Sequence, residues 1–180
     1  VFNLSLVAEN HYFNKDYEKA KKVLKKFKKD DDFYYWFRLK KEAQIISAQR
    51  NNQESLNFIK FNFDKIENPN EKILFDVANF YKKAKNYEEA IRYYSKIIEN
   101  LDDNSDIKSD ILYRRGGTYE RIKNYEKADK DLIDALQITP DDAYILNYLA
   151  YSWLERDYKI NEAIKMLETA YELESDDPVS

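Results

Sequence analysis

Cysteine is absent from this chain of 180 residues, and glycine and proline are scarce, with two and three copies. Without cysteine, neither a disulfide nor a thiol nucleophile can form. Glycine and proline are the residues that most strongly interrupt regular structure, so their scarcity predicts a chain that is helical almost throughout. We therefore expect an all-α fold.

Histidine is nearly absent as well, because His11 is the single copy. Without cysteine or a second histidine, no nucleophile–base pair can be built, and no cluster of His, Asp and Glu has metal-ligand spacing. There is also no glycine-rich loop that would hold a phosphate. We predict no catalytic residue, no metal and no cofactor, and we assign His11 a packing role.

The chain also lacks an excess of positive charge, since 30 Lys and Arg face 34 Asp and Glu, for a net charge of −4. A nucleic-acid-binding domain would be expected to carry a basic stripe, so the balance opposes that role. No apolar run approaches 18 residues, which predicts no membrane span. No signal peptide is visible and the chain begins with Val1, which we interpret as an excerpt or a processed form. The compartment is therefore open: cytoplasmic, or periplasmic if a parent protein has an export signal outside this chain.

A small residue recurs along the chain, shortly after a Tyr-Glu or Asn-Glu pair. The markers that we align are Ala20, Glu54 (which stands in for the small residue), Ala90, Ala128 and Ala163, at steps of 34, 36, 38 and 35 residues. A period near 34 residues with a buried small side chain is typical of stacked helical hairpins. Such stacks are surfaces that hold other proteins, so the repeat predicts a class of function.

The repeat at 109–142 is the clearest. Gly116 and Ala128 are expected to be small because the two helices of the hairpin cross closely there, and Tyr119 fills the space beside the crossing. Pro140 is expected to end the second helix, since it has no N–H to donate. Arg115 falls at a position that is usually apolar, so either its charged end snorkels to solvent or the register is looser there.

The residues Leu112, Gly116, Tyr119, Ala128, Leu132, Ala135 and Pro140 resemble the tetratricopeptide repeat (TPR) pattern. The resemblance extends over a single domain, 1–180, with repeats at about 1–34, 35–70, 71–108, 109–142 and 143–178. It implies a right-handed superhelical solenoid of about five helical hairpins, or about ten helices. The second repeat is degenerate, because Glu42 and Glu54 stand where small residues are expected.

A narrower resemblance covers the last repeat. Residues 146–155, followed by 161–163, are similar to late repeats of large bacterial TPR proteins. That similarity implies that the chain is an inner part of a longer array. With no polar capping helix after Pro178, we expect the C-terminal face to expose apolar side chains.

In the TPR family, the first helix of each hairpin lines a concave groove that binds protein segments. The resemblance places eleven residues in that groove: Phe75, Asn79, Lys82, Tyr113, Arg114, Gly117, Arg121, Tyr144, Asn147, Tyr148 and Tyr151. Tyr buries area yet keeps a hydroxyl, and Arg can bind a carboxylate through two hydrogen bonds. Gly117 either makes room for a ligand or is a neutral substitution that a well-packed helix tolerates. The tyrosines of 144–151 could instead pack on a further repeat or on another copy of the chain.

Two functions follow from this interpretation. The preferred one is a non-catalytic scaffold or adaptor that binds a peptide or protein segment in the groove. The alternative is a structural segment that self-associates, for example as a homodimer through its end repeats. An enzyme would need residues from elsewhere in a longer protein. RNA binding is opposed by the acidic balance, although Lys82, Lys83, Arg114 and Arg121 form a local basic strip. The variant that clamps chaperone C-termini is not matched, because Phe75 and Arg114 replace a required Lys and Asn.

The close crossing gives a first prediction. Substituting Gly116→Leu or Ala128→Leu should force the hairpin apart and lower the free energy of unfolding by about 1–3 kcal/mol through overpacking. The measurement is thermal or denaturant unfolding followed by circular dichroism. A variant that melts like the parent would show that the repeat register is wrong.

Overall fold

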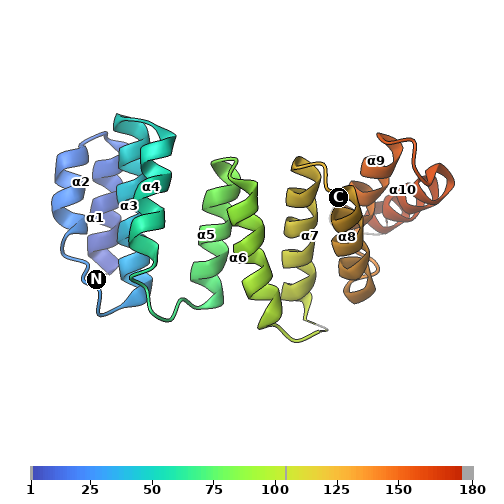
Figure 1. Ribbon diagram of the computed structural model, residues 1–180, viewed down its shortest axis with the longest axis horizontal. Helices are drawn as coiled ribbons and strands as arrows, with labels where there is room; N and C mark the ends of the chain where they lie inside the picture. The colour runs from blue at the N-terminus through green and yellow to red at the C-terminus, as the bar shows by residue number, and fades with distance from the viewer. Residues whose placement is uncertain (1, 104, 176–180) are drawn as a thin grey trace. The chain divides into compact units, whose positions relative to one another are not determined.

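The computed structural model describes residues 2–103 and 105–175, and all regular structure in these ranges is α-helical, without a strand (Figure 1). The helices are α1 (Phe2–Phe13), α2 (Tyr17–Leu24), α3 (Asp32–Gln49), α4 (Asn52–Phe63), α5 (Glu71–Lys83), α6 (Tyr87–Glu99), α7 (Asp106–Arg121), α8 (Tyr125–Ile138), α9 (Ala143–Leu154) and α10 (Ile160–Ser175). They form five consecutive hairpins, so the predicted all-α fold of paired helices is confirmed. The link at 176–178, which was expected to close the fifth repeat, lies outside the described residues.

The chain divides into two compact units. The first ends at Asp76 and the second begins at Val77, so α5 starts in one unit and continues into the other. The first unit holds the hairpins α1–α2 and α3–α4, and the second holds α6 and the hairpins α7–α8 and α9–α10. That the two units form a single continuous solenoid stays a prediction from the repeat pattern.

Three hairpin turns are built in the same way. Lys15, Lys85 and Lys123 each adopt a left-handed backbone conformation, with φ of 60°, 61° and 59°. In the third and fourth hairpins the next residue is an asparagine, Asn86 or Asn124, whose side chain accepts a hydrogen bond from the backbone N–H three residues later. Such a cap satisfies one of the free N–H groups at a helix start. In the third and fourth hairpins, a left-handed residue followed by an asparagine cap therefore marks where the second helix begins.

The two helices of a hairpin cross at small, buried residues that lie 12 positions apart. The pairs are Ala8 and Ala20, Ala78 and Ala90, and Gly116 and Ala128. A Cβ atom on Gly116 would lie 3.1 Å from Leu132 Cγ and 3.2 Å from the carbonyl oxygen of Ala128, so even an alanine would require these neighbours to shift by a few tenths of an ångström. In the fifth hairpin, Ala150 and Ala163 are 13 positions apart, because the turn holds one extra residue.

The second hairpin corrects the predicted alignment. The buried small residue is Ser55 and not Glu54, and its partner is Ala43 and not Glu42. Ser55 Oγ donates a 2.7 Å hydrogen bond to the carbonyl oxygen of Ala43, so the hydroxyl is satisfied inside the crossing. Glu54 points outward and pairs with Arg50 at 2.6 Å. With Ser55 as the marker, this hairpin has the same 12-residue spacing as the others, and it is less degenerate than predicted.

The second hairpin was hard to align because its turn is different. Helix α3 runs for 18 residues, and Arg50 at its end is followed at once by Asn51, the cap of α4. Neither Arg50 nor Asn51 adopts the left-handed conformation found in the other turns. In this hairpin Gln53 and Glu54 stand directly before the small residue, where other repeats have a Tyr-Glu pair one position earlier. The predicted marker, Glu54, therefore lies one position before the buried small residue.

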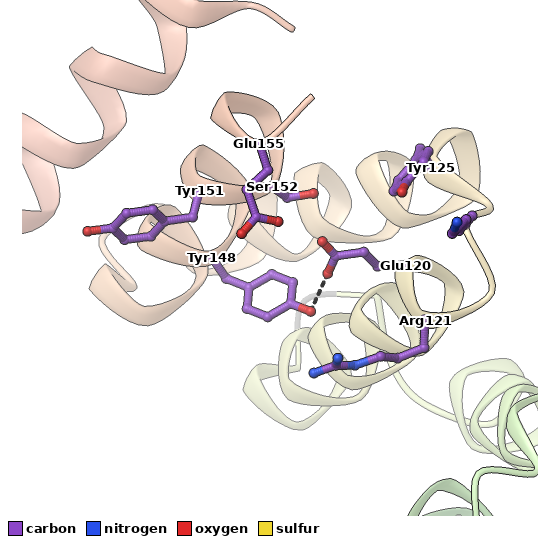
Figure 2. A pocket seen from close by; sticks show the side chains of 8 residues that line it. Glu120, Arg121, Tyr125, Tyr148, Tyr151, Ser152 and Glu155 are labelled. Carbon is purple, nitrogen blue, oxygen red and sulfur yellow. Dashed lines mark hydrogen bonds between the residues drawn. The ribbon is translucent and has the colours of Figure 1, made fainter. Parts of the chain in front are cut away.

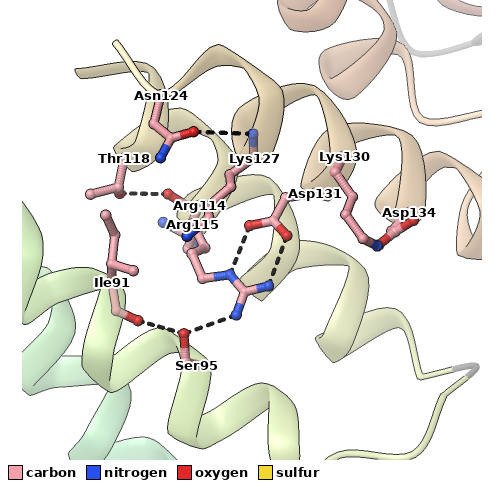
Figure 3. Close-up of polar contacts among 10 residues, drawn as sticks. All are labelled: Ile91, Ser95, Arg114, Arg115, Thr118, Asn124, Lys127, Lys130, Asp131 and Asp134. Carbon is pink, nitrogen blue, oxygen red and sulfur yellow. Dashed lines mark hydrogen bonds and ion pairs between the residues drawn. The ribbon is translucent and has the colours of Figure 1, made fainter. Parts of the chain in front are cut away.

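Arg115 neither snorkels to solvent nor marks a loose register. Its guanidinium binds both carboxylate oxygens of Asp131 on α8 at 2.7 Å, and its Nη1 donates to Ser95 Oγ on α6 at 2.9 Å (Figure 3). The Asp131 side chain is only 5% exposed. Burial acts to lower the pKa of Arg115, but the hydrogen bonds and charge of Asp131 outweigh it and raise that pKa. Arg115 thus connects three consecutive helices, through an ion pair to α8 and a hydrogen bond to α6.

The apolar core of the second unit is formed by side chains of α7, α8, α9 and α10. Leu112 of α7, Leu132 of α8, and Ile145, Leu149 and Trp153 of α9 form one buried cluster. A separate cluster in the first unit is built around Leu24, Phe27 and Ile45. His11 is half-buried, and its Nδ1 lies 3.8 Å from the Asp16 carboxylate.

The Arg115–Asp131 pair generates a second prediction. Asp131→Ala leaves a buried guanidinium without its counter-charge, so we expect the free energy of unfolding to fall by about 3–5 kcal/mol. The double variant Arg115→Met, Asp131→Leu should lose much less, because both charges are replaced by apolar groups of similar volume. Urea unfolding of the two variants measures the difference. Equal losses would show that the pair does not act as a coupled unit.

Candidate protein-interaction face

Ten of the eleven predicted groove residues lie in the second unit. They are Asn79 and Lys82 on α5, Tyr113, Arg114, Gly117 and Arg121 on α7, and Tyr144, Asn147, Tyr148 and Tyr151 on α9. We call this set the α5–α7–α9 face. The eleventh residue, Phe75, belongs to the first unit on the early part of α5. These helices are the first members of three successive hairpins, so the repeat predicts that residues about 35 positions apart share a face.

Tyr148 of α9 packs directly on α7 of its own chain. Its ring meets that of Tyr113 edge to face, with centroids 5.4 Å apart, and its hydroxyl donates to the Glu120 carboxylate (Figure 2). Burial, together with the hydrogen bond and charge of Glu120, raises the pKa of Tyr148. This tyrosine therefore holds α9 against α7 and is only in part available to a partner.

The same contact explains Gly117. A Cβ atom at this position would lie 3.1 Å from the Tyr148 hydroxyl oxygen and 3.5 Å from the adjoining ring carbon. The missing side chain therefore makes room for a tyrosine of the same chain. Neither of the two interpretations offered for Gly117, space for a ligand or a tolerated neutral substitution, describes what fills that space.

Two pockets open beside the paired rings. One, of about 440 Å³, is lined by Glu120, Arg121, Lys123, Tyr125, Tyr148, Tyr151, Ser152 and Glu155 (Figure 2). The other, of about 510 Å³, is lined by Asp106, Ser109, Asp110, Tyr113, Thr139, Asp142, Tyr144 and Ile145. Tyr148 lines the first and Tyr113 the second. The face is therefore a row of tyrosines with a hollow of mixed charge on one side and an acidic one on the other.

Several lining residues were not among the predicted site residues. Tyr125 begins α8, and Asp142 caps α9, so both come from the ends of helices rather than from the periodic positions of a first helix. Glu155 follows Tyr151 by four residues, a spacing that could have indicated a shared helix face. Tyr125 belongs to the recurring Tyr-Glu pair that marks the repeat, so the sequence placed it at the start of a second helix but gave no sign that it lines a pocket.

Three cations gather on α5 and α7. Lys82 is half-buried, and its pKa is lowered by burial and by the positive charges of Arg114 and Arg121. Arg114 Nε lies 2.8 Å from Asp110 Oδ2, and Arg121 is exposed at the edge of the first pocket. Burial is the largest of the causes that lower the pKa of Lys82.

Asn79 is already engaged inside the unit. The hydroxyl of Tyr94, which is fully buried on α6, donates to Asn79 Oδ1 at 2.7 Å. Burial is the main cause that raises the pKa of Tyr94 to about 12. By contrast, Tyr144 and Tyr151 are 78% and 59% exposed, so they are the aromatic side chains of this face most open to a partner.

Two other kinds of site are absent from the described ranges. Within residues 2–103 and 105–175, no three His, Asp or Glu side chains come together as a set that could hold a metal ion. In the same ranges, none of the helices combines the length and the apolar character needed to cross a membrane.

Two of the repeats match a known family. Residues 71–100 and 109–142 match the family model described as tetratricopeptide repeat. These two segments comprise the hairpins α5–α6 and α7–α8, and the predicted resemblance to TPR proteins is confirmed. No curated protein sequence matches the chain significantly.

Solved structures of TPR-type proteins share the fold. MamA from Desulfovibrio magneticus RS-1 (residues 41 to the end) superposes with a TM-score of 0.68 at 14% identity, covering 97% of this chain and 95% of that one. Another MamA structure gives 0.66 at 16% identity, covering 94% and 95%. YrrB, described as a TPR protein with an unusual peptide-binding site, gives 0.63 at 13% identity, covering 94% and 84%.

Tyr94 generates a third prediction, which concerns alkaline stability. The pKa of this phenol is about 12 in the folded chain and about 10 when unfolded, so the folded state keeps the proton longer. The stabilisation is full below about pH 10 and is lost as the pH rises toward 12. Tyr94→Phe removes this titration, so stability should fall less steeply across that window.

The check is a set of urea unfolding curves between pH 9 and pH 12. Tyr148→Phe is a second test, because burial also raises the pKa of Tyr148, and this variant should likewise lose stability less steeply with pH. The lowered pKa of Lys82 acts in the opposite direction, because it makes stability rise with pH. An unchanged slope in Tyr94→Phe would contradict the assignment.

Proposed function

We propose that this chain is a non-catalytic scaffold or adaptor that binds a peptide or protein segment on its α5–α7–α9 face. The observation that supports the proposal most directly is the exposure of Tyr144 and Tyr151 beside two pockets on one side of the second unit. TPR folds in general mediate protein–protein interaction. The proposal places that interaction on a stated set of residues.

The chemistry of the face suits a peptide. Exposed tyrosines supply large contact area with only two side-chain torsions to immobilise, and their hydroxyls can bond a peptide backbone. Arg121, at the rim of the first pocket, can bind a carboxylate through two parallel hydrogen bonds. The fixed Tyr113–Tyr148 pair between the pockets is already ordered, so it loses little conformational freedom when a partner binds.

The similarity to YrrB is consistent with the proposal. That protein is described as having a peptide-binding site on a TPR fold. At 13% identity the likeness extends to the fold alone, so the residues that would bind a peptide here are argued from this chain. The surface that these residues form is not purely apolar, because charged side chains line the pockets beside the tyrosines.

Exposed apolar side chains on α10 favour a second function, self-association. Ile160, Ile164 and Tyr171 are exposed on α10, and their spacings of four and seven residues place them on one helix face. Such an apolar stripe is typical of an association surface. It would support the structural role, in which the chain pairs with itself or with a further repeat.

A peptide selection tests the preferred function. Peptides selected from a display library on the immobilised chain should bind with affinities that fall about tenfold in the double variant Tyr144→Ala, Tyr151→Ala, since each change removes an exposed aromatic anchor. Both side chains are largely solvated, so the variant should keep the parent's unfolding temperature. Tyr171→Ala, which removes an exposed tyrosine from α10, is the matched control.

Light scattering over a concentration series accompanies the selection. A monomer whose peptide binding depends on Tyr144 and Tyr151 agrees with the proposal. A dimer that Ile164→Asp dissociates, combined with no selected peptide, would instead favour self-association through α10.

A further inference from the structure

We propose that a pocket of the first unit is a second docking site, which binds an acidic segment of a protein partner. The pocket has a volume of about 530 Å³ and is lined by side chains from α2, α3 and α4 and from the residues that end α2 and α3. Ile46 and Phe58 are its apolar lining, and Lys21 and Lys25 are two of its cations. This site is separate from the α5–α7–α9 face, because every residue that lines it belongs to the first unit.

The pocket can hold an apolar side chain of a partner. Ile46 of α3 and Phe58 of α4 are only half-buried, so part of each side chain meets solvent in the free chain. Covering this surface with an apolar group removes it from water, which is favourable. An apolar lining with a few polar groups at fixed positions is typical of a binding pocket. An apolar side chain of the segment therefore serves as its anchor.

Both carboxylates that line the pocket already have cationic partners. Glu42 accepts a 3.0 Å hydrogen bond from Arg38, four residues earlier on α3. Glu54 pairs with Arg50 at 2.6 Å, and the hydrogen bond from Arg50 lowers the pKa of Glu54. The charges of both acids are thus offset within the first unit, so the pocket does not select a cation.

Lys25 is the cation of this pocket that is available to a partner. Lys21 Nζ lies 2.9 Å from Glu18 Oε1 and 3.1 Å from Gln49 Oε1, so it is engaged between α2 and α3. Lys25, at the end of α2, is exposed, and its ammonium forms no hydrogen bond or ion pair with the residues that the structure describes. It lines the same pocket as the apolar pair, so a carboxylate can bind Lys25 while a neighbouring apolar side chain fills the pocket.

The lysine-rich stretch around Lys25 strengthens the attraction of an acidic segment. Residues 19–29 contain seven of the chain's 30 Lys and Arg and none of its 34 Asp and Glu. Lys22, Lys26 and Lys28 are exposed there, and none of them has an ion-pair partner within the described ranges. The α2 dipole favours lysines in the last turn of the helix, but Lys28 follows the helix. Charge of one sign concentrated in this way speeds the association of an oppositely charged partner.

An acidic protein segment fits this pocket better than a membrane or a nucleic acid does. A planar anionic surface or a chain of phosphates would also approach Glu18, Glu42 and Glu54, which lie beside the cations. A phosphate group has nothing apolar to place in the pocket. A peptide can put a carboxylate at Lys25 and an apolar side chain beside it, and can avoid the three acids.

Fluorescence anisotropy tests the site with labelled probes of equal length: an acidic peptide of Glu and Ser with one Leu, its Gln counterpart, a counterpart with Ala in place of the Leu, and an oligouridine. The acidic Leu peptide should bind at least about tenfold more tightly than the Gln peptide, and less tightly as salt is added. It should bind about fivefold more tightly than the Ala peptide, because the anchor is lost there. Titration with phosphatidylserine vesicles tests a membrane in a separate arm.

Two variants of the chain locate the site. Lys25→Gln removes the available cation, and Asn57→Glu adds a negative charge at an exposed residue that lines the same pocket. Each should weaken binding of the acidic peptide about fivefold. Lys22→Gln is the matched control, because it removes the same charge from α2 at a residue outside the pocket lining, and it should weaken binding less than about twofold.

Thermal unfolding of the same variants separates recognition from an effect on the fold. All three side chains are exposed, so the variants should keep the parent's unfolding temperature. If Lys25→Gln lost both affinity and stability, Lys25 would be a structural residue and the inference would be overturned.

The other outcomes are equally decisive. Equal affinities for the acidic and Gln peptides, equal losses in Lys25→Gln and Lys22→Gln, or tighter binding of the vesicles or the oligouridine would each overturn the inference. Acidic-peptide binding that is lost in the double variant Tyr144→Ala, Tyr151→Ala would overturn it while the proposed function stands. Acidic-peptide binding that depends on Lys25 and is unchanged in that double variant supports it, whatever peptides the display selection yields.

Discussion

The close crossing of two helices at a pair of small residues is the constraint on which the rest of the structure depends. At Gly116 and Ala128 even one added carbon would touch a backbone oxygen, and the other hairpins keep buried alanines or a serine at the same spacing. The spacing of 12 residues between the two small side chains limits the length of the connecting turn. It also determines which faces of the two helices are in contact. When the fifth hairpin adds a residue, the spacing becomes 13 and the crossing is still made by two alanines.

Polar contacts inside these crossings fix the register. Ser55 replaces alanine in the second hairpin because its hydroxyl finds the Ala43 carbonyl, and Arg115 replaces an apolar residue because Asp131 and Ser95 satisfy its guanidinium. An apolar side chain could occupy either site in more than one helix register. A directional bond between named atoms tolerates fewer, which is how polar groups in a core restrict alternatives.

The candidate interaction face follows from the same geometry. Stacking of successive hairpins brings α7 and α9 together closely enough that Tyr148 occupies the space left at Gly117. That contact orders the centre of the face, while Tyr144 and Tyr151 remain exposed beside it. The free chain thus presents an ordered pair of aromatic rings with exposed tyrosines beside it.

The sequence by itself determined the helical class, the repeat and the set of residues on the first helices, because 3.6-residue periodicity and the scarcity of glycine and proline are local properties. The alignment predicted from the sequence was wrong by one residue in the second hairpin, because a serine replaces the usual buried alanine there and the turn is shorter. Only the tertiary structure decided that Tyr148 fills the space at Gly117, that Arg115 is neutralised by Asp131, and that Lys82 is not neutralised by any carboxylate of the described residues. Each depends on the distance between helices that are far apart in sequence, and that distance comes from packing.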